Sequence, residues 1–192
     1  LVWGEQGLGD EILYFSLLKS KKLPPKNTYI VCADKNISLF KRSFPENKIF
    51  GFNEVTTDDF FDTHIPVGSL GQHFRPTIES FKNQPEKYLS ADDQKTDVLR
   101  KKHLNGKKYL CGISWKSNAG SEKSCSIDEL LPIFKLNDIS FVNLQYGSVS
   151  REINSIDKKY QIKIGNDTSL DLFNNIDDLA SLTDACDFIL TT

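Results

Sequence analysis

Short apolar runs and amphipathic segments alternate along the first half of the chain. Up to residue 104 the periodicity predicts strands at 1–3, 28–32, 48–50 and 64–67 and helices at 10–21, 37–43 and 91–104. Residues 70–89 carry Gly71, Pro76 and Pro85 among polar positions, which predicts a long loop with one helical turn at 77–81. Loops of that length inside a compact domain are uncommon and often functional.

The same alternation begins again after Asn105 and Gly106, which indicate a helix stop and a hinge. It predicts strands at 108–114, 140–144, 161–164 and 187–191 and helices at 126–135, 150–158 and 176–184. Two successive βαβ series indicate an α/β protein with two Rossmann-like domains and mainly parallel sheets, at residues 1–104 and 105–192. The chain begins without Met in a predicted strand and stops directly after another, so we expect a fragment whose second domain is truncated.

The composition of the chain mainly excludes classes of protein and kinds of site. Of 192 residues, 39% are hydrophobic and 26% charged, as in ordinary globular domains, and a net charge of −2 argues against a dedicated nucleic-acid binder. Lys19, Lys21 and Lys22 end the first predicted helix, where lysines are usually solvated. No apolar stretch approaches the roughly 18 residues of a spanning helix and no leader opens the chain, so we expect a cytoplasmic protein. Since the four cysteines form no C-x-x-C pair, we expect neither zinc nor disulfides.

The first predicted strand runs into a glycine-rich loop, Gly4 to Asp10, which opens a helix. Its spacing, G-x-x-G-x-G, is not the dinucleotide fingerprint G-x-G-x-x-G, and no Gly-Lys-Ser/Thr follows to form a nucleoside-triphosphate loop. Glycines let a ligand approach the backbone, and a helix N-terminus favours negative charge. The loop therefore suits an anionic or hydroxyl-rich ligand.

Several short motifs resemble those of one family. They are G-E-Q-G-L-G-D-E-I-L at 4–13, R-S-F-P at 42–45, H-I-P-V-G-S-L at 64–70, Y-L at 88–89, G-I-S-W-K-S at 112–117 and L-Q-Y-G at 144–147. The chain resembles, over nearly its whole length, bacterial proteins in which tetratricopeptide repeats precede a domain related to the heptosyltransferases of glycosyltransferase family 9, with the two-domain GT-B architecture.

This resemblance implies an inverting, metal-independent transfer of a sugar from a nucleotide-diphospho-sugar donor to a glycan or protein acceptor. It implies an acceptor side in residues 1–104 and a nucleotide-sugar side in residues 105–192, with the donor site completed by residues that would follow Thr192. It also implies tetratricopeptide repeats in the same polypeptide and no cofactor besides the donor substrate.

Asp10 is the candidate catalytic residue. An inverting transfer needs a carboxylate that takes the proton of the acceptor hydroxyl, and the aspartate of the Gly-Asp pair is the proposed base in the resembling heptosyltransferases. An aspartate directly before an apolar helix is equally a preferred N-cap. The two interpretations stay open, and Asp10→Asn would separate them because asparagine caps well but is no base. Gly7, Leu8 and Gly9 beside it are candidate substrate-binding residues.

A second group follows the first predicted strand of the second half. Lysines at the carboxyl end of such a strand can neutralise a diphosphate leaving group, which makes Lys116 the favoured residue and Lys123 a weaker candidate. Both are equally typical of flexible loops, and Trp115 is equally typical of a packing residue. The candidate binding residues here are Ser114, Trp115, Lys116, Ser117 and Lys123.

Gln145, Tyr146 and Gly147 follow the next predicted strand at the equivalent end, where they can contact a base or ribose, and Tyr146 can stack on it. A turn glycine and a half-buried tyrosine explain them equally well. His64 is a candidate for the acceptor side, although a lone histidine is more often structural.

The acids Asp58, Asp59 and Asp62 lie beside phenylalanines, but no further ligand is indicated, so we predict no metal site. Two further functions remain: a non-catalytic binding or scaffold module that keeps the fold, and another nucleotide-binding enzyme such as an epimerase.

Overall fold

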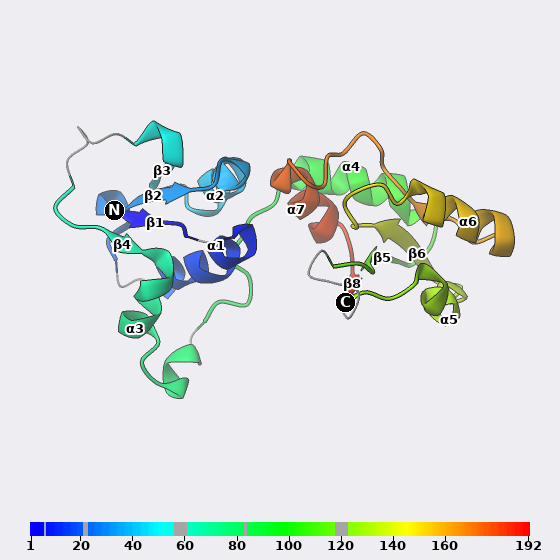
Figure 1. Ribbon diagram of the computed structural model, residues 1–192, viewed down its shortest axis with the longest axis horizontal. Helices are drawn as coiled ribbons and strands as arrows, with labels where there is room; N and C mark the ends of the chain where they lie inside the picture. Colours follow the sequence, from blue (N-terminus) through cyan, green and yellow to red (C-terminus); the bar gives the residue numbers. More distant parts are fainter. Residues whose placement is uncertain (6, 21–22, 56–60, 83, 118–122) are drawn as a thin grey trace. The chain divides into compact units, whose positions relative to one another are not determined.

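The computed structural model describes residues 1–192 except for 6, 21–22, 56–60, 83 and 118–122. The chain divides into two compact units, the first at Leu1–Ser90 and the second at Ala91–Thr192. Each unit holds one four-stranded sheet in which every pairing is parallel, with helices packed against it (Figure 1). The predicted α/β class with mainly parallel sheets is therefore confirmed.

The first unit orders its strands β3-β2-β1-β4. These strands are β1 (Val2–Trp3), β2 (Tyr29–Cys32), β3 (Lys48–Gly51) and β4 (Ile65–Pro66). The α-helices are α1 (Leu8–Phe15), α2 (Ile37–Ser43) and α3 (Leu70–Phe74). Short 3-10 helices lie at Ser16–Ser20, Pro25–Asn27, Asp34–Asn36, Phe52–Glu54, Val67–Ser69 and Ile78–Phe81. Ile30, Val31 and Cys32 are all buried, as expected for a parallel strand covered on both faces.

Three local predictions for the first unit need correction. The first helix begins at Leu8 rather than at residue 10, and it changes to 3-10 geometry at Ser16. Residues 70–89 are less irregular than predicted, because α3 fills Leu70–Phe74, while the predicted turn is present at Ile78–Phe81. Lys19 is not simply solvated, since its Nζ donates to the Ser43 carbonyl at 2.7 Å and lies over the Phe44 ring. Lys21 and Lys22 lie outside the described residues.

The second unit repeats the topology with the order β7-β6-β5-β8. Its strands are β5 (Tyr109–Ser114), β6 (Ile139–Asn143), β7 (Ile164–Gly165) and β8 (Phe188–Thr191). Its α-helices are α4 (Asp93–Leu104), α5 (Leu131–Phe134), α6 (Ser150–Tyr160) and α7 (Ile176–Asp184), and a 3-10 helix at Ile127–Leu130 precedes α5. The predicted helix at 126–135 is thus two short pieces, and Pro132, which lacks a backbone N–H, lies at the start of the second.

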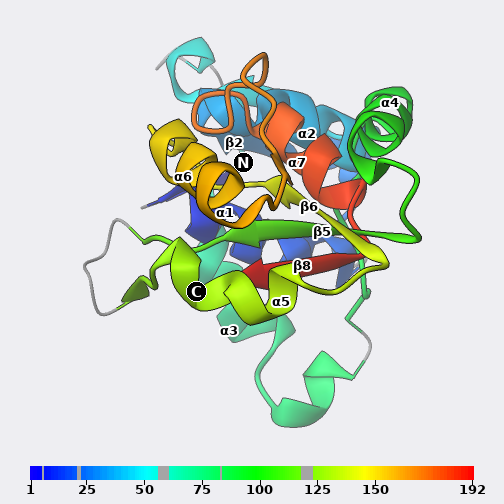
Figure 2. The same ribbon diagram turned by 90° about the vertical axis from the view of Figure 1, so that its right-hand side faces the viewer.

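The sheet of the second unit separates two apolar clusters. Cys111 and Ile113 of β5 face one cluster together with Ile153 and Ile156 of α6. Leu110 lies in the other cluster, beside residues of α4 and α7. Successive residues of a strand point to opposite faces, so one strand supplies both cores. Figure 2 shows α5 on one side of this sheet and α4 and α7 on the other.

Helix α4 belongs to the second unit, although the sequence analysis placed it at the end of the first domain. Leu99 packs into the cluster formed with Leu110 and Leu182. Lys95 forms an ion pair with Asp178, and Arg100 donates to the Ala185 carbonyl at 2.6 Å. The boundary therefore lies before α4, because the apolar side of this polar helix is covered within the second unit.

No helix in the described part of the chain is long and apolar enough to cross a bilayer. The described residues likewise contain no group of three His, Cys, Asp or Glu side chains that could hold a metal ion. Asp58 and Asp59 lie outside the described residues, and Asp62 is exposed.

Candidate functional site

In both sheets the strand order reverses beside the first strand of the unit, at β1 and at β5. Open parallel sheets bind ligands beyond the carboxyl ends of their strands at such a reversal, because the loops there diverge and leave a crevice. The loop after β1 begins at Gly4, and the loop after β5 begins at Trp115. The glycine-rich motif after β1 and the lysine-bearing motif after β5 therefore each lie at the edge of their sheet where a ligand is expected.

Asp10 occupies the third position of α1 rather than the N-cap. Gly7 is the N-cap, and its backbone N–H donates to Asp10 Oδ2 at 3.2 Å. The prediction that Asp10 is the N-cap is therefore wrong. Asp10 lies within the first turn of α1 and accepts a hydrogen bond from the N-cap residue, Gly7. Leu8 and Gly9 form that first turn, where backbone N–H groups have no intrahelical partner. A carboxylate has about four acceptor positions, so this hydrogen bond leaves Asp10 with room to accept from a further donor.

Glu11 is a buried acid that the sequence analysis missed. Its carboxylate accepts hydrogen bonds from the Ala33 N–H at 3.0 and 3.1 Å and from Asn36 Nδ2 at 2.9 Å. Burial raises the pKa of Glu11, and these hydrogen bonds partly oppose that rise. A Cβ on Gly4 would lie 2.1 Å from Glu11 Oε1, so Gly4 makes room for this contact. A second acid directly before the apolar residues of α1 was the available signal.

His64 lies apart from these residues in the fold. It directly precedes β4 and lines a pocket of about 370 Å³ with Leu1, Thr28 and Thr63, each of which also precedes a strand. That pocket is at the amino ends of the strands, whereas Gly7, Leu8, Gly9 and Asp10 follow the carboxyl end of β1.

In the second unit, the Gln145 side chain connects the loop after β6, to which it belongs, with the loop after β5 through hydrogen bonds. Gln145 is buried, and its Oε1 accepts hydrogen bonds from Ser114 Oγ at 3.0 Å, the Trp115 N–H at 3.1 Å and the Lys116 N–H at 2.8 Å. Asn143 in turn accepts from the Gln145 N–H at 2.9 Å. The structure brings Ser114, Trp115, Lys116 and Gln145 together, and Oε1 of Gln145 holds the loop rather than pointing to a ligand.

Trp115 and Lys116 both contact Glu152, a residue of α6 that the sequence analysis did not single out. Trp115 is fully buried, so it is a packing residue, and its Nε1 donates to Glu152 Oε2 at 3.0 Å. The exposed Lys116 places its Nζ 2.6 Å from Glu152 Oε1. Burial by itself raises the pKa of Glu152, but hydrogen bonds from Lys116 and Trp115 outweigh it and lower that pKa.

The remainder of this loop is described only in part. The Ser117 N–H donates to Ser124 Oγ at 2.9 Å. Lys123 is exposed. Lys116 and Lys123 thus each directly precede one of the two hydrogen-bonded serines.

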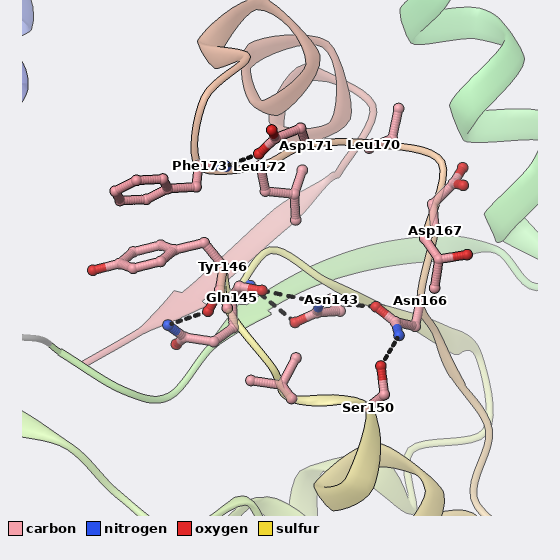
Figure 3. Close-up of a pocket in the computed structure, with 13 residues that line it drawn as sticks. Asn143, Gln145, Tyr146, Ser150, Asn166, Asp167, Leu170, Asp171, Leu172 and Phe173 are labelled. Atoms are coloured by element: carbon pink, nitrogen blue, oxygen red, sulfur yellow. Dashed lines mark hydrogen bonds between the residues drawn. The ribbon is translucent and has the colours of Figure 1, made fainter.

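A pocket of about 390 Å³ lies between the loops that follow β6 and β7 (Figure 3). The Tyr146 and Phe173 rings stand beside each other on one wall, with their centroids 5.4 Å apart. The other lining residues are Asn143, Gln145, Gly147, Val149, Ser150, Asn166, Asp167, Thr168, Leu170, Asp171 and Leu172. Gly147 has a φ of 90°, which few other residues adopt. Aromatic faces and amide groups suit a nucleoside, and this described lining contains no lysine or arginine.

The two acids of the pocket, Asp167 and Asp171, accept hydrogen bonds from residues of their own loop. Asp167 Oδ1 accepts from the Ser169 N–H and hydroxyl, and Asp171 Oδ1 accepts from the Phe173 and Asn174 N–H groups. Such Asp-based turns fix loop geometry. The sequence analysis found Tyr146 but missed Phe173 and both acids, although acids and amides after a predicted strand were a usable signal.

Comparison with known proteins identifies one distant relative. The chain is 26% identical to Protein FlbA of Caulobacter vibrioides in an alignment that covers 99% of this chain and 35% of that protein. The chain therefore spans about a third of the length of the curated relative that it matches. No family model matches the chain, and no solved structure matches it.

Proposed function

We propose that this chain is a glycosyltransferase domain that transfers a sugar from a nucleotide-diphospho-sugar donor, with inversion and without a metal ion, to a glycan or protein acceptor. The resemblance to heptosyltransferase-like domains supports this proposal, because three of its six motifs lie at the carboxyl ends of β1, β5 and β6. We further propose a cytoplasmic location and tetratricopeptide repeats in the same polypeptide.

One observation carries the proposal, namely the pairing of an aromatic and amide pocket, whose described lining has two acids but no lysine or arginine, with a separate lysine loop. Tyr146 lines the pocket, and Gln145 directly before it holds the Lys116 backbone at 2.8 Å. A nucleoside diphosphate needs both features, a surface for stacking and hydrogen bonding of the nucleoside and a cation for the diphosphate. Pocket and lysine are therefore linked by two adjacent residues of one loop.

The proposed roles follow from chemistry. Tyr146 and Phe173 stack on the base, Asn143 and Asn166 contact the nucleoside, and Lys116 neutralises the charge that develops on the leaving diphosphate. Asp10, in the first unit, takes the proton of the acceptor hydroxyl.

A non-catalytic binding module is the second candidate. This candidate is favoured because both proposed reactive groups already have partners within the chain. Lys116 is paired with Glu152, and Asp10 accepts a hydrogen bond from Gly7. Such contacts are also what a folded scaffold would retain after catalysis was lost.

Calorimetric titration separates the two. The natural protein in full length, with the 192-residue chain beside it, would be titrated with UDP, ADP, GDP and their sugar conjugates. We expect saturable binding of one nucleotide class, weakened about 10- to 150-fold by Lys116→Ala, because a charge-assisted contact to a diphosphate contributes about 1.5–3 kcal/mol. Lys135→Ala removes an exposed lysine at the end of α5 and should leave the affinity unchanged. Absence of binding to the full-length protein would favour the scaffold module.

A further inference from the structure

Glu152 lies in the first turn of α6, with its carboxylate directed at the lysine loop. Oε2 accepts from Trp115 Nε1 at 3.0 Å, and Oε1 is 2.6 Å from Lys116 Nζ. The backbone N–H groups of Trp115 and Lys116 are held in turn by Gln145 Oε1. The Glu152 carboxylate therefore contacts the side chains of two consecutive residues, Trp115 and Lys116, whose backbone is held by Gln145.

The two contacts of Glu152 differ in how far they are buried. Trp115 is fully buried, so the hydrogen bond from its indole holds the carboxylate in one orientation. The side chains of Lys116 and Glu152 are 46% and 31% exposed, and exposed ion pairs of this kind contribute little to stability. The weak contact can therefore open while the strong one keeps the carboxylate in place.

We propose that Glu152 is an internal anion that occupies Lys116 in the free chain and competes with the diphosphate of the nucleotide. This inference rests on the proposed function, since it names how the donor site is controlled. A diphosphate and Glu152 are both negative, and a lysine ammonium is a single positive charge. Binding therefore requires Lys116 to leave Glu152, whereas the hydrogen bond from Trp115 to Glu152 remains.

The test compares Glu152→Gln with the parent chain by titration with UDP, ADP and GDP. Glutamine keeps an oxygen that can accept from Trp115 but carries no charge to pair with Lys116. We expect about two- to fivefold tighter binding of the nucleoside diphosphate, because the exposed ion pair that must open in the parent chain is absent from the variant. Glu129→Gln, an exposed acid in the 3-10 helix before α5, is the matched control and should change nothing.

Two further measurements separate competition from a general loosening of the loop. In a Lys116→Ala background, Glu152→Gln should no longer tighten binding, because the competition acts through the lysine. In a Trp3→Phe background Trp115 is the single tryptophan, so its fluorescence reports on the departure of Lys116 from the Glu152 carboxylate, which stays beside the indole. We expect nucleotide binding to shift this fluorescence when Glu152 is present and to shift it less in Glu152→Gln.

The outcomes distinguish this inference from the function on which it rests. Binding by the parent chain with an equal or weaker affinity in Glu152→Gln would overturn the competition and leave the transferase proposal standing. Tighter binding that persists without Lys116 would also overturn it. Failure of both the parent chain and Glu152→Gln to bind any nucleotide would overturn both proposals.

Discussion

At the scale of single residues, a buried carboxylate joins helix α1 to the segment after β2. Glu11 is 3% exposed, and its carboxylate accepts hydrogen bonds from Ala33 and Asn36 of that segment. A buried charge is costly unless it is hydrogen-bonded, so this position tolerates little displacement. Gly4 faces the same carboxylate without a side chain.

Gly4→Ala should destabilise the first unit. Its new Cβ would lie 2.1 Å from Glu11 Oε1, and the buried carboxylate cannot move away without losing its hydrogen bonds. Overpacking of this kind costs about 1–3 kcal/mol of unfolding free energy, measurable by urea denaturation followed by circular dichroism.

Gly9→Ala is the control for that experiment. Gly9 lies within α1, and a Cβ there meets nothing within 4 Å among the described residues. Alanine in a helix should leave stability unchanged or raise it by up to about 1 kcal/mol. Equal stability of the two variants would contradict the close contact.

At the scale of elements, helix α4 anchors the loop that carries the pocket. Lys102 Nζ donates to Asp167 Oδ2 at 2.6 Å, and His103 Nε2 lies 3.5 Å from the same oxygen. A Cβ on Gly165 would lie 2.6 Å from His103 Nδ1, so β7 passes directly against this histidine. The position of the pocket loop therefore depends on a helix that lines no part of the pocket.

Asp167→Asn should change the acid stability of the second unit. Burial alone raises the pKa of Asp167, but hydrogen bonds from Lys102 and Ser169 outweigh it and lower the pKa from 3.8 to about 2. A lowered folded-state pKa adds stability above the unfolded-state value, and that stability is lost as pH falls from 3.8 towards about 2. The contribution at neutral pH is about 2 kcal/mol.

Urea denaturation over a range of pH measures this contribution. Asp167→Asn should lower the unfolding free energy at neutral pH and reduce its decline on acidification. Asp157→Asn, at an exposed position in α6, serves as the control and should follow the parent curve. Parallel curves for the parent and Asp167→Asn would show that the ionised carboxylate contributes nothing.

At the scale of the whole molecule, the division before α4 has a direct consequence. Residues 91–192 should fold alone, whereas residues 105–192 should not. The shorter piece lacks Leu99 from the apolar cluster, and it loses the partners of Asp178 and Asp187, which are Lys95 and Arg100.

Circular dichroism and urea unfolding of the two pieces test this division. A cooperative transition is expected for residues 91–192, and little residual structure is expected for residues 105–192. Equal folding of both pieces would place the boundary after α4, where the sequence pattern put it.

The outcomes at particular residues show how far sequence patterns reach. Apolar periodicity located most strands because a parallel strand buries consecutive residues, as at Ile30, Val31 and Cys32. The strand predicted at 161–164 was misplaced, since β7 begins only at Ile164. The same reasoning misplaced α4, because a polar helix carries too weak a pattern to indicate which sheet it covers. Asp10 was recognised as a helix-start residue, but whether it or Gly7 caps α1 depends on backbone angles that composition does not specify.

The sequence by itself determined the alternation of strands and helices, the parallel sheets and the loops that follow β1, β5 and β6. These follow from local periodicity and from the glycines and polar residues at strand ends. Only the tertiary structure decided that Gln145 holds the backbone of Lys116 and that Glu152 holds its ammonium group. Those contacts join residues 29 and 36 positions apart, and they form only because helices and strands pack in one particular order.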